Sequence, residues 1–496
     1  MNSKKKIKLD LPAMNILTTL LNQLVTTCCG LITPRVLIGA FGSDAYGIAV
    51  SITQFLSYIT LLEGGIGGVA RAELYGPLAR NDTQQIGSVY YAVKRFFNYV
   101  AIAFLGYSVV LGLVYHDLAR VTAFSRTYIF LLVMTISLST LAKYMGGLAN
   151  LTLIVADKKQ YVNNYISIGI TLANTICIVL LVFLQCDLIW VKLGSSLVFV
   201  VRPLLYTYYV KRHYRLPKKV SAHSELKQKW TGMGQHFAYF LHKNTDVVLL
   251  TLLADIRYVA VYSVYNMVIS SIRSIAEAFT GGMEAVFGNL IAKGKTVELQ
   301  KTYRKYQSLM TVTTLVLFNC TGILIVSFVR LYTRGVTDAD YIQPAFAFVF
   351  LLAEAVNCLA LSSSTLPVAA NHLRQTKRGA YGEAIVNLLL SCLLIRWNPL
   401  LGVAIGTLAA TIFRAIYYMV YSAKIILHLP IHSILLPFLG SLVLLCGVIL
   451  CGSAAIKWIV IENYFQWFVC GVVTFVTICL PTLMVAHMYF RRLKKA

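Results

Sequence analysis

Polar side chains recur at helical spacing inside segments that are otherwise apolar. In residues 258–290 the intervals are 7, 4 and 7 positions, through Asn266, Arg273, Glu277 and Glu284. At about 100° per residue these four side chains share one face of a helix. Because charge is costly in a lipid bilayer, that face is expected to meet a water-filled cavity, a polar ligand or another helix.

Two further segments carry a polar face of the same kind. Residues 12–40 place four polar groups at the same intervals, namely Asn15, Asn22, Thr26 and Thr33. Residues 400–423 gather a second set on one face, namely Thr407, Thr411, Arg414 and Tyr418. All three segments are therefore expected to turn these faces away from lipid.

The first of these segments also contains a proline. Pro34 removes a backbone donor, so it predicts a kink in the helix and frees a carbonyl group. Arg35 follows it directly and, on an ideal helix, points away from the polar face of its segment. A kinked first helix that carries an arginine suits a moving gate.

These patterns leave two interpretations open. The ionisable groups either bind a ligand or pair with one another inside a helix bundle. Arg273 and Glu277 stand four residues apart on one helix and could neutralise each other. The same alternative holds for Lys243 and Asp246.

The composition predicts a chain that lies almost entirely in the membrane. Hydrophobic residues make up 58% of the 496 positions and charged residues only 13%, about half the share in soluble domains. Apolar blocks long enough to cross a hydrocarbon core of about 30 Å recur from end to end. We expect fourteen spans, at about 12–40, 45–70, 88–114, 122–149, 162–185, 187–210, 233–253, 258–290, 305–330, 341–370, 380–396, 400–423, 433–454 and 463–490.

The basic residues are distributed unequally between the two sides of these spans. Of the 44 lysines and arginines, 30 fall on the side of the N-terminus and 7 on the other side. By the positive-inside rule both termini are expected to be cytoplasmic. The net charge of +25 follows from this rule and from attraction to anionic lipids, and no nucleic-acid-binding module accompanies it.

Short patterns recur at a nearly constant offset of 213 or 214 residues. The matched positions are Glu63 with Glu277, Thr152 with Thr365, and Asn174 with Asn387. An offset of this length holds six spans, so the two halves are expected to share one orientation in the membrane, an architecture of transporters. We expect a first lobe at 1–210, a cytoplasmic linker at 211–232, a second lobe at 233–423, and two added spans with a basic tail at 424–496.

The chain resembles the multidrug/oligosaccharidyl-lipid/polysaccharide exporter superfamily. The resemblance lies in the arrangement of six, six and two spans and in the run Pro34-Arg35 … Phe41-Gly42-x-x-x-Tyr46-Gly47. Within this superfamily the chain is most similar to the polysaccharide-transporter branch, the Wzx-type flippases. The resemblance implies a protein of the bacterial inner membrane without cofactors. It would flip a polyprenyl-diphosphate-linked oligosaccharide to the outer leaflet by alternating access, alongside other polysaccharide-assembly membrane proteins.

This function assigns roles to the intramembrane polar residues. A desolvated diphosphate favours arginine, so the candidate phosphate ligands are Arg35, Arg71, Arg273 and Arg414, with Lys243 as a further cation. The candidate sugar ligands are Asn15, Asn22, Asn266 and Asn357. Candidates for coupling to Na⁺ or H⁺, or for gating, are Asp246, Glu277, Glu354, Glu63 and Pro34. The resemblance further implies that the last two spans hold the polyprenyl tail.

Three alternatives compete with this function. A peptidoglycan-precursor flippase would use the same mechanism on a different headgroup. A multidrug antiporter needs unpaired acids in its cavity, and Asp246 and Glu354 keep that alternative open. A membrane enzyme is disfavoured, because the longest external loop, 331–340, is short and no catalytic or metal-binding spacing occurs, including among the eleven cysteines.

Overall fold

The computed structural model describes residues 11–63, 66–217, 244–372, 374–456, 458–459 and 461–495, and all regular secondary structure in these ranges is helical. Eleven helices in the described ranges are long and apolar enough to cross a membrane. The predicted all-α membrane fold is confirmed, since each of the fourteen predicted segments falls on helix within the described ranges.

Three of the fourteen predicted spans are not counted among these eleven helices, each for a local reason. The first two predicted spans lie in one helical stretch, Ala13–Glu63. The seventh is described only over its last part, the helix Asn244–Leu253. The eleventh is α13 (Lys377–Leu394), whose first turns carry charged residues.

The first helix is interrupted at a glycine. α1 (Leu11–Ser57) has non-helical dihedral angles at Gly42, where φ is 78° and ψ is 176°. A side chain with a Cβ atom is strained at this φ, whereas glycine is not. Gly42 falls between the first two predicted spans, 12–40 and 45–70. Pro34 lies inside α1 with helical backbone angles, and the kink expected there stays a prediction.

Polar caps fix where several helices begin. Asp82 accepts a hydrogen bond from the backbone amide of Gln85 at the start of α3 (Thr83–Leu118). Ser125 likewise accepts one from a backbone amide in the first turn of α4 (Arg126–Ala142). Asn398 caps α14 (Pro399–Tyr421) through the amide of Leu401. Such caps satisfy backbone donors that the first turn leaves open, so they separate consecutive spans with short turns.

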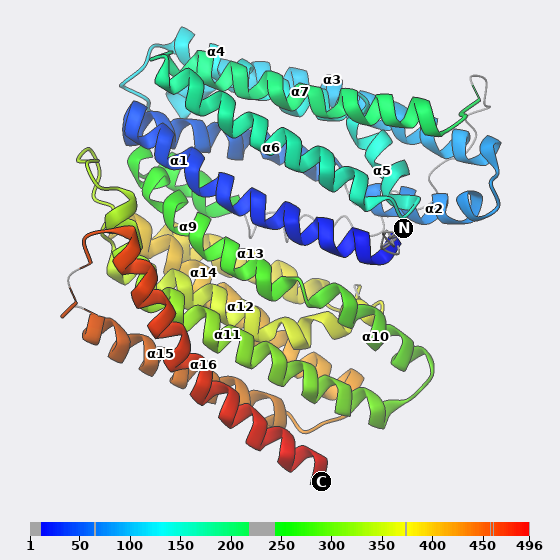
Figure 1. Cartoon of the computed structure of the whole chain (residues 1–496), viewed down its shortest axis with the longest axis vertical. Helices are drawn as coiled ribbons and strands as arrows, with labels where there is room; N and C mark the ends of the chain where they lie inside the picture. Colours follow the sequence, from blue (N-terminus) through cyan, green and yellow to red (C-terminus); the bar gives the residue numbers. More distant parts are fainter. Residues whose placement is uncertain are drawn as a thin grey trace, which may run out of the picture. The chain divides into compact units, whose positions relative to one another are not determined.

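The contacts divide the chain into two units, and the first comprises residues 1–236. After α1 it contains η1 (Tyr58–Glu63), α2 (Ile66–Ala79), α3, α4, η2 (Lys143–Gly147), α5 (Leu148–Ala156), α6 (Gln160–Phe183) and α7 (Leu188–His213). Within the unit α6 packs against α1 and α7, and α4 packs against α3 and α7 (Figure 1). Most of the expected linker at 211–232 lies outside the described residues.

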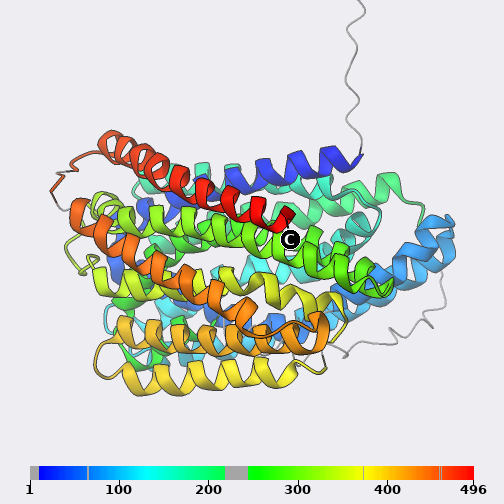
Figure 2. The same cartoon turned by 90° about the horizontal axis from the view of Figure 1, so that it is seen from below.

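The second unit comprises residues 237–496. Beyond the helix at 244–253 it contains α9 (Ile256–Glu277), α10 (Thr280–Ala292), α11 (Thr296–Tyr332), α12 (Pro344–Ala369), α13, α14, η3 (Ser422–Leu427), α15 (His432–Ile456) and α16 (Tyr464–Lys495). α12 forms the centre of its core, since it packs against α9, α10, α11 and α14. α15 and α16 lie against α11 at the side of the unit (Figure 2).

The predicted repeat has a structural counterpart in each unit. In both, the fourth span packs against the second, third and sixth, and the fifth packs against the sixth. Asn174 accepts a hydrogen bond from the Ser195 hydroxyl at 2.7 Å and so joins α6 to α7. Asn387 donates to the Thr407 hydroxyl at 2.9 Å and joins α13 to α14. The matched asparagines therefore cross-link the fifth and sixth spans of their own units.

Candidate functional site

The repeated glutamates lie where the second span of each unit departs from one continuous α-helix. Glu63 is the last described residue of the 3₁₀-helical segment η1, and α9 ends at Glu277, with α10 beginning three residues later at Thr280. Broken helices are tolerated at membrane depth where the irregular backbone is buried in protein or lines a cavity, and transporters use them to build binding sites. The second span of each unit is thus the first place to look for a site.

In the second unit, Arg273 lies between two carboxylates. Its Nη1 atom is 2.5 Å from Oε1 of Glu354 on α12, and its Nε atom is 3.4 Å from Oε1 of Glu277. The Asn357 amide donates to the other oxygen of Glu354 at 3.4 Å. The expected pair with Glu277 is present, but the nearer partner is on another helix, which helical spacing alone does not reveal.

The charges in this cluster do not balance. Arg273 and Glu354 are 15% and 10% exposed, so their pairing is largely shielded from solvent, while Glu277 is 37% exposed. One guanidinium faces two carboxylates, which gives a net negative cluster when all three groups are ionised. A buried excess of negative charge is stabilised by a proton or by a bound cation.

Asp246 forms a second acidic site in the same unit. It is only 4% exposed, and it accepts hydrogen bonds from the Tyr262 hydroxyl at 3.1 Å and from the Thr407 hydroxyl at 3.0 Å. Both donors are neutral. The Oδ1 atom of Asn387, whose amide nitrogen bonds to the same Thr407 hydroxyl, is buried and accepts no hydrogen bond within the described ranges.

These atoms suit a small cation. Carboxylate, hydroxyl and amide oxygens from the seventh, eleventh and twelfth spans converge around Asp246, and hard cations prefer oxygen ligands. The unused amide oxygen of Asn387 is an additional acceptor at this place. Asp246 was expected as a coupling residue from its depth alone. Its hydroxyl partners on α9 and α14 are new information from the structure.

In the first unit, the corresponding cluster contains a residue outside the predicted set. The Nζ atom of Lys143 lies 3.1 Å from Oε1 of Glu63, and the Tyr144 hydroxyl donates to the same oxygen at 2.5 Å. Lys143 begins the π-helical turn η2, which interrupts the fourth span. A lysine inside an apolar block was a visible signal for it, but its distance from the end of the span left its role undecided.

Several predicted residues make contacts inside their own unit. Asn15 donates to the carbonyl of Lys158 at 2.8 Å and accepts from the amide of Tyr161 at 2.9 Å, so it holds the turn between α5 and α6. Arg414 lies 3.2 Å from the buried carboxylate of Glu383 and over the Tyr418 ring. Asn15 and Arg414 therefore use the polar atoms of their side chains for contacts within their own units.

The remaining candidates differ in how far they are buried. Arg35 on α1, Arg71 on α2 and Asn266 on α9 are half-buried. The amide oxygen of Asn22 is buried and accepts no hydrogen bond from the described residues. Lys243 lies outside the described residues.

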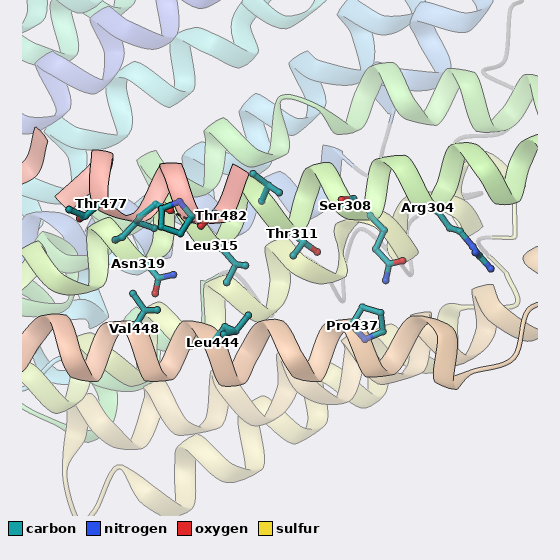
Figure 3. Close-up of a pocket in the computed structure, with 14 residues that line it drawn as sticks. Arg304, Ser308, Thr311, Leu315, Asn319, Pro437, Leu444, Val448, Thr477 and Thr482 are labelled. Atoms are coloured by element: carbon teal, nitrogen blue, oxygen red, sulfur yellow. Dashed lines mark hydrogen bonds between the residues drawn. The ribbon is translucent and has the colours of Figure 1, made fainter. Parts of the chain in front are cut away.

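An apolar groove of about 390 Å³ runs between α11, α15 and α16 (Figure 3). Arg304 and Asn319 on α11 lie toward its two ends, 15 residues apart, which corresponds to about 22 Å along a helix. Leu315, Leu444 and Val448 line it between them. The groove is therefore long, narrow and predominantly apolar, with a cation at one end.

Comparison with solved structures identifies the fold of this chain. The lipid II flippase MurJ, in an inward closed conformation, matches with a TM-score of 0.68 and 15% identity over 97% of this chain and 99% of that one. The chain has the MurJ–MATE fold. The MATE multidrug transporter DinF-BH shares this fold with a TM-score of 0.62 and 16% identity over 87% of this chain and 99% of its own.

A eukaryotic MATE transporter, AtDTX14, has the MurJ–MATE fold as well, with a TM-score of 0.59 and 11% identity over 87% of this chain and all of its own. The share of this chain that both MATE alignments leave out is about as long as α15 and α16 together. No protein-family model matches the sequence, and no curated protein does.

Proposed function

We propose that this protein flips a polyprenyl-diphosphate-linked oligosaccharide, the repeat unit of a cell-surface polysaccharide, from the cytoplasmic to the outer leaflet of a bacterial inner membrane. The groove between α11, α15 and α16 carries this proposal. It is apolar, about 22 Å long, and built with the two helices that follow the twelve-span repeat. A polyprenyl chain is an elongated apolar ligand that fits such a groove.

The headgroup is assigned to the interrupted helices. Arg273 on α9, with Arg35 and Arg71 as further cations, serves the diphosphate, because guanidinium groups hold phosphate oxygens in two parallel hydrogen bonds. Asn22, Asn266 and Asn357 serve the sugar hydroxyls. Arg414 and Asn15 are given structural roles instead, because their partners, Glu383 and the turn between α5 and α6, do not belong to the second span of either unit.

Energy for the cycle is assigned to a cation that binds at Asp246. A Na⁺ ion or proton entering from outside would neutralise this buried carboxylate and would be drawn inward by the membrane potential. One charge that crosses the full field gains about 2.3 kcal/mol per 100 mV, which is close to a fiftyfold effect on an equilibrium. Glu354, beside Arg273, is the second candidate for this role.

The test uses purified protein in sealed vesicles. Flipping of a polyprenyl-diphosphate-linked oligosaccharide is followed by the access of an external glycosidase, and valinomycin with a potassium gradient imposes the potential. A potential that is negative on the side corresponding to the cytoplasm is expected to raise the flipping rate severalfold. Equal rates with and without the potential, at fixed Na⁺ and pH, would refute the energy assignment.

Two related functions are separated by the substrate in the same vesicles. Movement of lipid II in preference to the oligosaccharide lipid would identify a peptidoglycan-precursor flippase, which the fold of MurJ favours. Movement of a lipophilic cationic dye, without either lipid, would identify a multidrug transporter, which the buried acid Asp246, held by neutral hydrogen-bond donors, favours. Flipping of the oligosaccharide lipid alone supports the proposal.

The topology assigned to this function has its own test. In a variant without native cysteines, Arg215→Cys beyond α7 and Asp338→Cys between α11 and α12 are placed on opposite sides of the membrane by the positive-inside rule. A membrane-impermeant thiol reagent added to intact cells is expected to label Asp338→Cys at least tenfold more than Arg215→Cys. Lysed cells serve as the control, in which both sites should react. The reverse pattern in intact cells would overturn the cytoplasmic assignment of the termini.

A further inference from the structure

The fourth span of the first unit changes its backbone in the middle of the membrane. Residues Arg126–Ala156 form one candidate span, but α4 ends at Ala142 and the π-helical turn η2 follows. In this turn Met145 has a ψ of 45° and Gly146 a φ of 115°, both outside the helical range. π-Helical turns occur frequently at functional sites, and irregular backbone at this depth needs a buried or hydrated setting.

The π-helical turn η2 places a basic side chain, Lys143, against an acidic one, Glu63. Lys143 lies 3.1 Å from Glu63, and Tyr144 donates its hydroxyl to the same carboxylate oxygen. The Tyr144 ring is fully buried, with its centroid 6.2 Å from that of Phe97 and 6.0 Å from that of Phe104. Tyr144 therefore fixes Glu63, and Glu63 in turn orients the ammonium group of Lys143.

Lys143 remains the accessible member of this cluster. Its side chain is 44% exposed, against 24% for Glu63. Seventeen residues separate it from the start of the candidate span at Arg126 and thirteen from its end at Ala156, so by length it lies near the middle of that span. An ammonium group has three donors and gives one to Glu63, and a half-exposed charge at this depth requires water or an anionic ligand.

The second unit also joins its second span to its fourth through an ionic contact, but at other positions of the repeat. Lys143 and Glu63 are 80 residues apart in the sequence, and Arg273 and Glu354 are 81. The residue that matches Glu63 in the repeat is Glu277, one helical turn beyond Arg273. Both contacts join the second span of a unit to its fourth, near the end of η1 in the first unit and of α9 in the second. Each unit thus sets a cation against a carboxylate between these two spans, Lys143 in the first and Arg273 in the second.

We propose that Lys143, positioned by Glu63 and Tyr144, is an anion-binding residue of the first unit that takes a phosphate oxygen of the transported diphosphate. This inference rests on the proposed function and adds a ligand to it. Lysine is suited to phosphate as a point charge with rotatable donors. Glu63 competes with the phosphate for the ammonium group and thereby keeps binding weak enough for release.

The test measures binding to the full-length protein in lipid nanodiscs, with polyprenyl diphosphate and the uncharged polyprenol of equal length as probes. Lys143→Gln is expected to weaken diphosphate binding about tenfold to a hundredfold, the range of one charge-assisted hydrogen bond, without changing polyprenol binding. Lys143→Arg should stay within a few-fold of the native protein. Glu63→Gln, which keeps an acceptor for Tyr144, should tighten diphosphate binding severalfold.

A purely structural ion pair gives a different pattern. In that case Lys143→Gln and Glu63→Gln would both weaken binding of the two probes, and the double variant would recover it, which would overturn the inference. Lys159→Gln is the matched control, because Lys159 is also ion-paired in this unit, 2.6 Å from Asp157, but in the turn outside the span. If the native protein binds polyprenol as tightly as the diphosphate, the proposed function itself fails. A native preference for diphosphate that Lys143→Gln preserves overturns only the role of Lys143.

Discussion

Asp246→Asn is expected to lower ion-driven flipping about a hundredfold while the protein remains folded. Asparagine retains an oxygen that can accept the hydrogen bonds of Tyr262 and Thr407, so the packing of the site is conserved. It removes the charge that a coupling cation needs. Loss of one buried charge contact corresponds to about 3 kcal/mol, a factor of about 100. The measurement is the flipping rate in vesicles under an imposed Na⁺ or proton gradient.

The control for this variant is an acid outside the bilayer. Asp340 lies in the connection between α11 and α12, where it accepts a hydrogen bond from the amide of Ile342 at 3.0 Å. Asp340→Asn should leave the gradient dependence unchanged. If Asp246→Asn retains full gradient-driven flipping and Glu354→Gln loses it, the coupling site is at Glu354. If both variants retain gradient-driven flipping, no ion is coupled through Asp246 or Glu354.

Arg273→Gln is expected to destabilise the protein and to abolish transport. Removing the guanidinium leaves Glu354 and Glu277 without their cation, and breaking a buried ion pair from one side costs about 3–5 kcal/mol. The double change Arg273→Gln with Glu354→Gln removes the stranded charge. It should restore most of the thermal stability in detergent, but transport should stay below one tenth of the native rate if Arg273 holds the diphosphate.

Arg414 and Glu383 supply the matched pair for this experiment. They form an ion pair at 3.2 Å in the same unit, on α14 and α13, and we assign it no ligand. Arg414→Gln with Glu383→Gln should therefore recover transport together with stability. Recovery of transport in the Arg273/Glu354 double variant as well would show that Arg273 has only a structural role.

The sequence predicted the spans and the repeat because both are local properties of the chain. A membrane-crossing helix needs a run of apolar residues, and the matched Asn174 and Asn387 occupy corresponding hydrogen-bonded positions in the two units. The predicted boundary between the first two spans, 12–40 and 45–70, lies at residues 41–44, and the break at Gly42 falls there. The sequence did not reveal that this break is a single residue within one helical stretch, because a glycine shows its φ only in the folded chain.

The partners within the candidate site could not be predicted in the same way. Helical spacing identifies neighbours three or four residues apart, and so it found Arg273 with Glu277. The contacts of Arg273 with Glu354 and of Lys143 with Glu63 span 81 and 80 residues. They depend on which helices pack together and in what rotation, and a single sequence carries no signal for that.

The contacts that hold each unit together also determine how far a substitution acts. The asparagine bridge between the fifth and sixth spans, and the ionic contact between the second and fourth, each close within a single unit. None of these four contacts joins one unit to the other. A substitution that breaks one of them is therefore expected to loosen its own unit and to leave the bonds of the other unit in place.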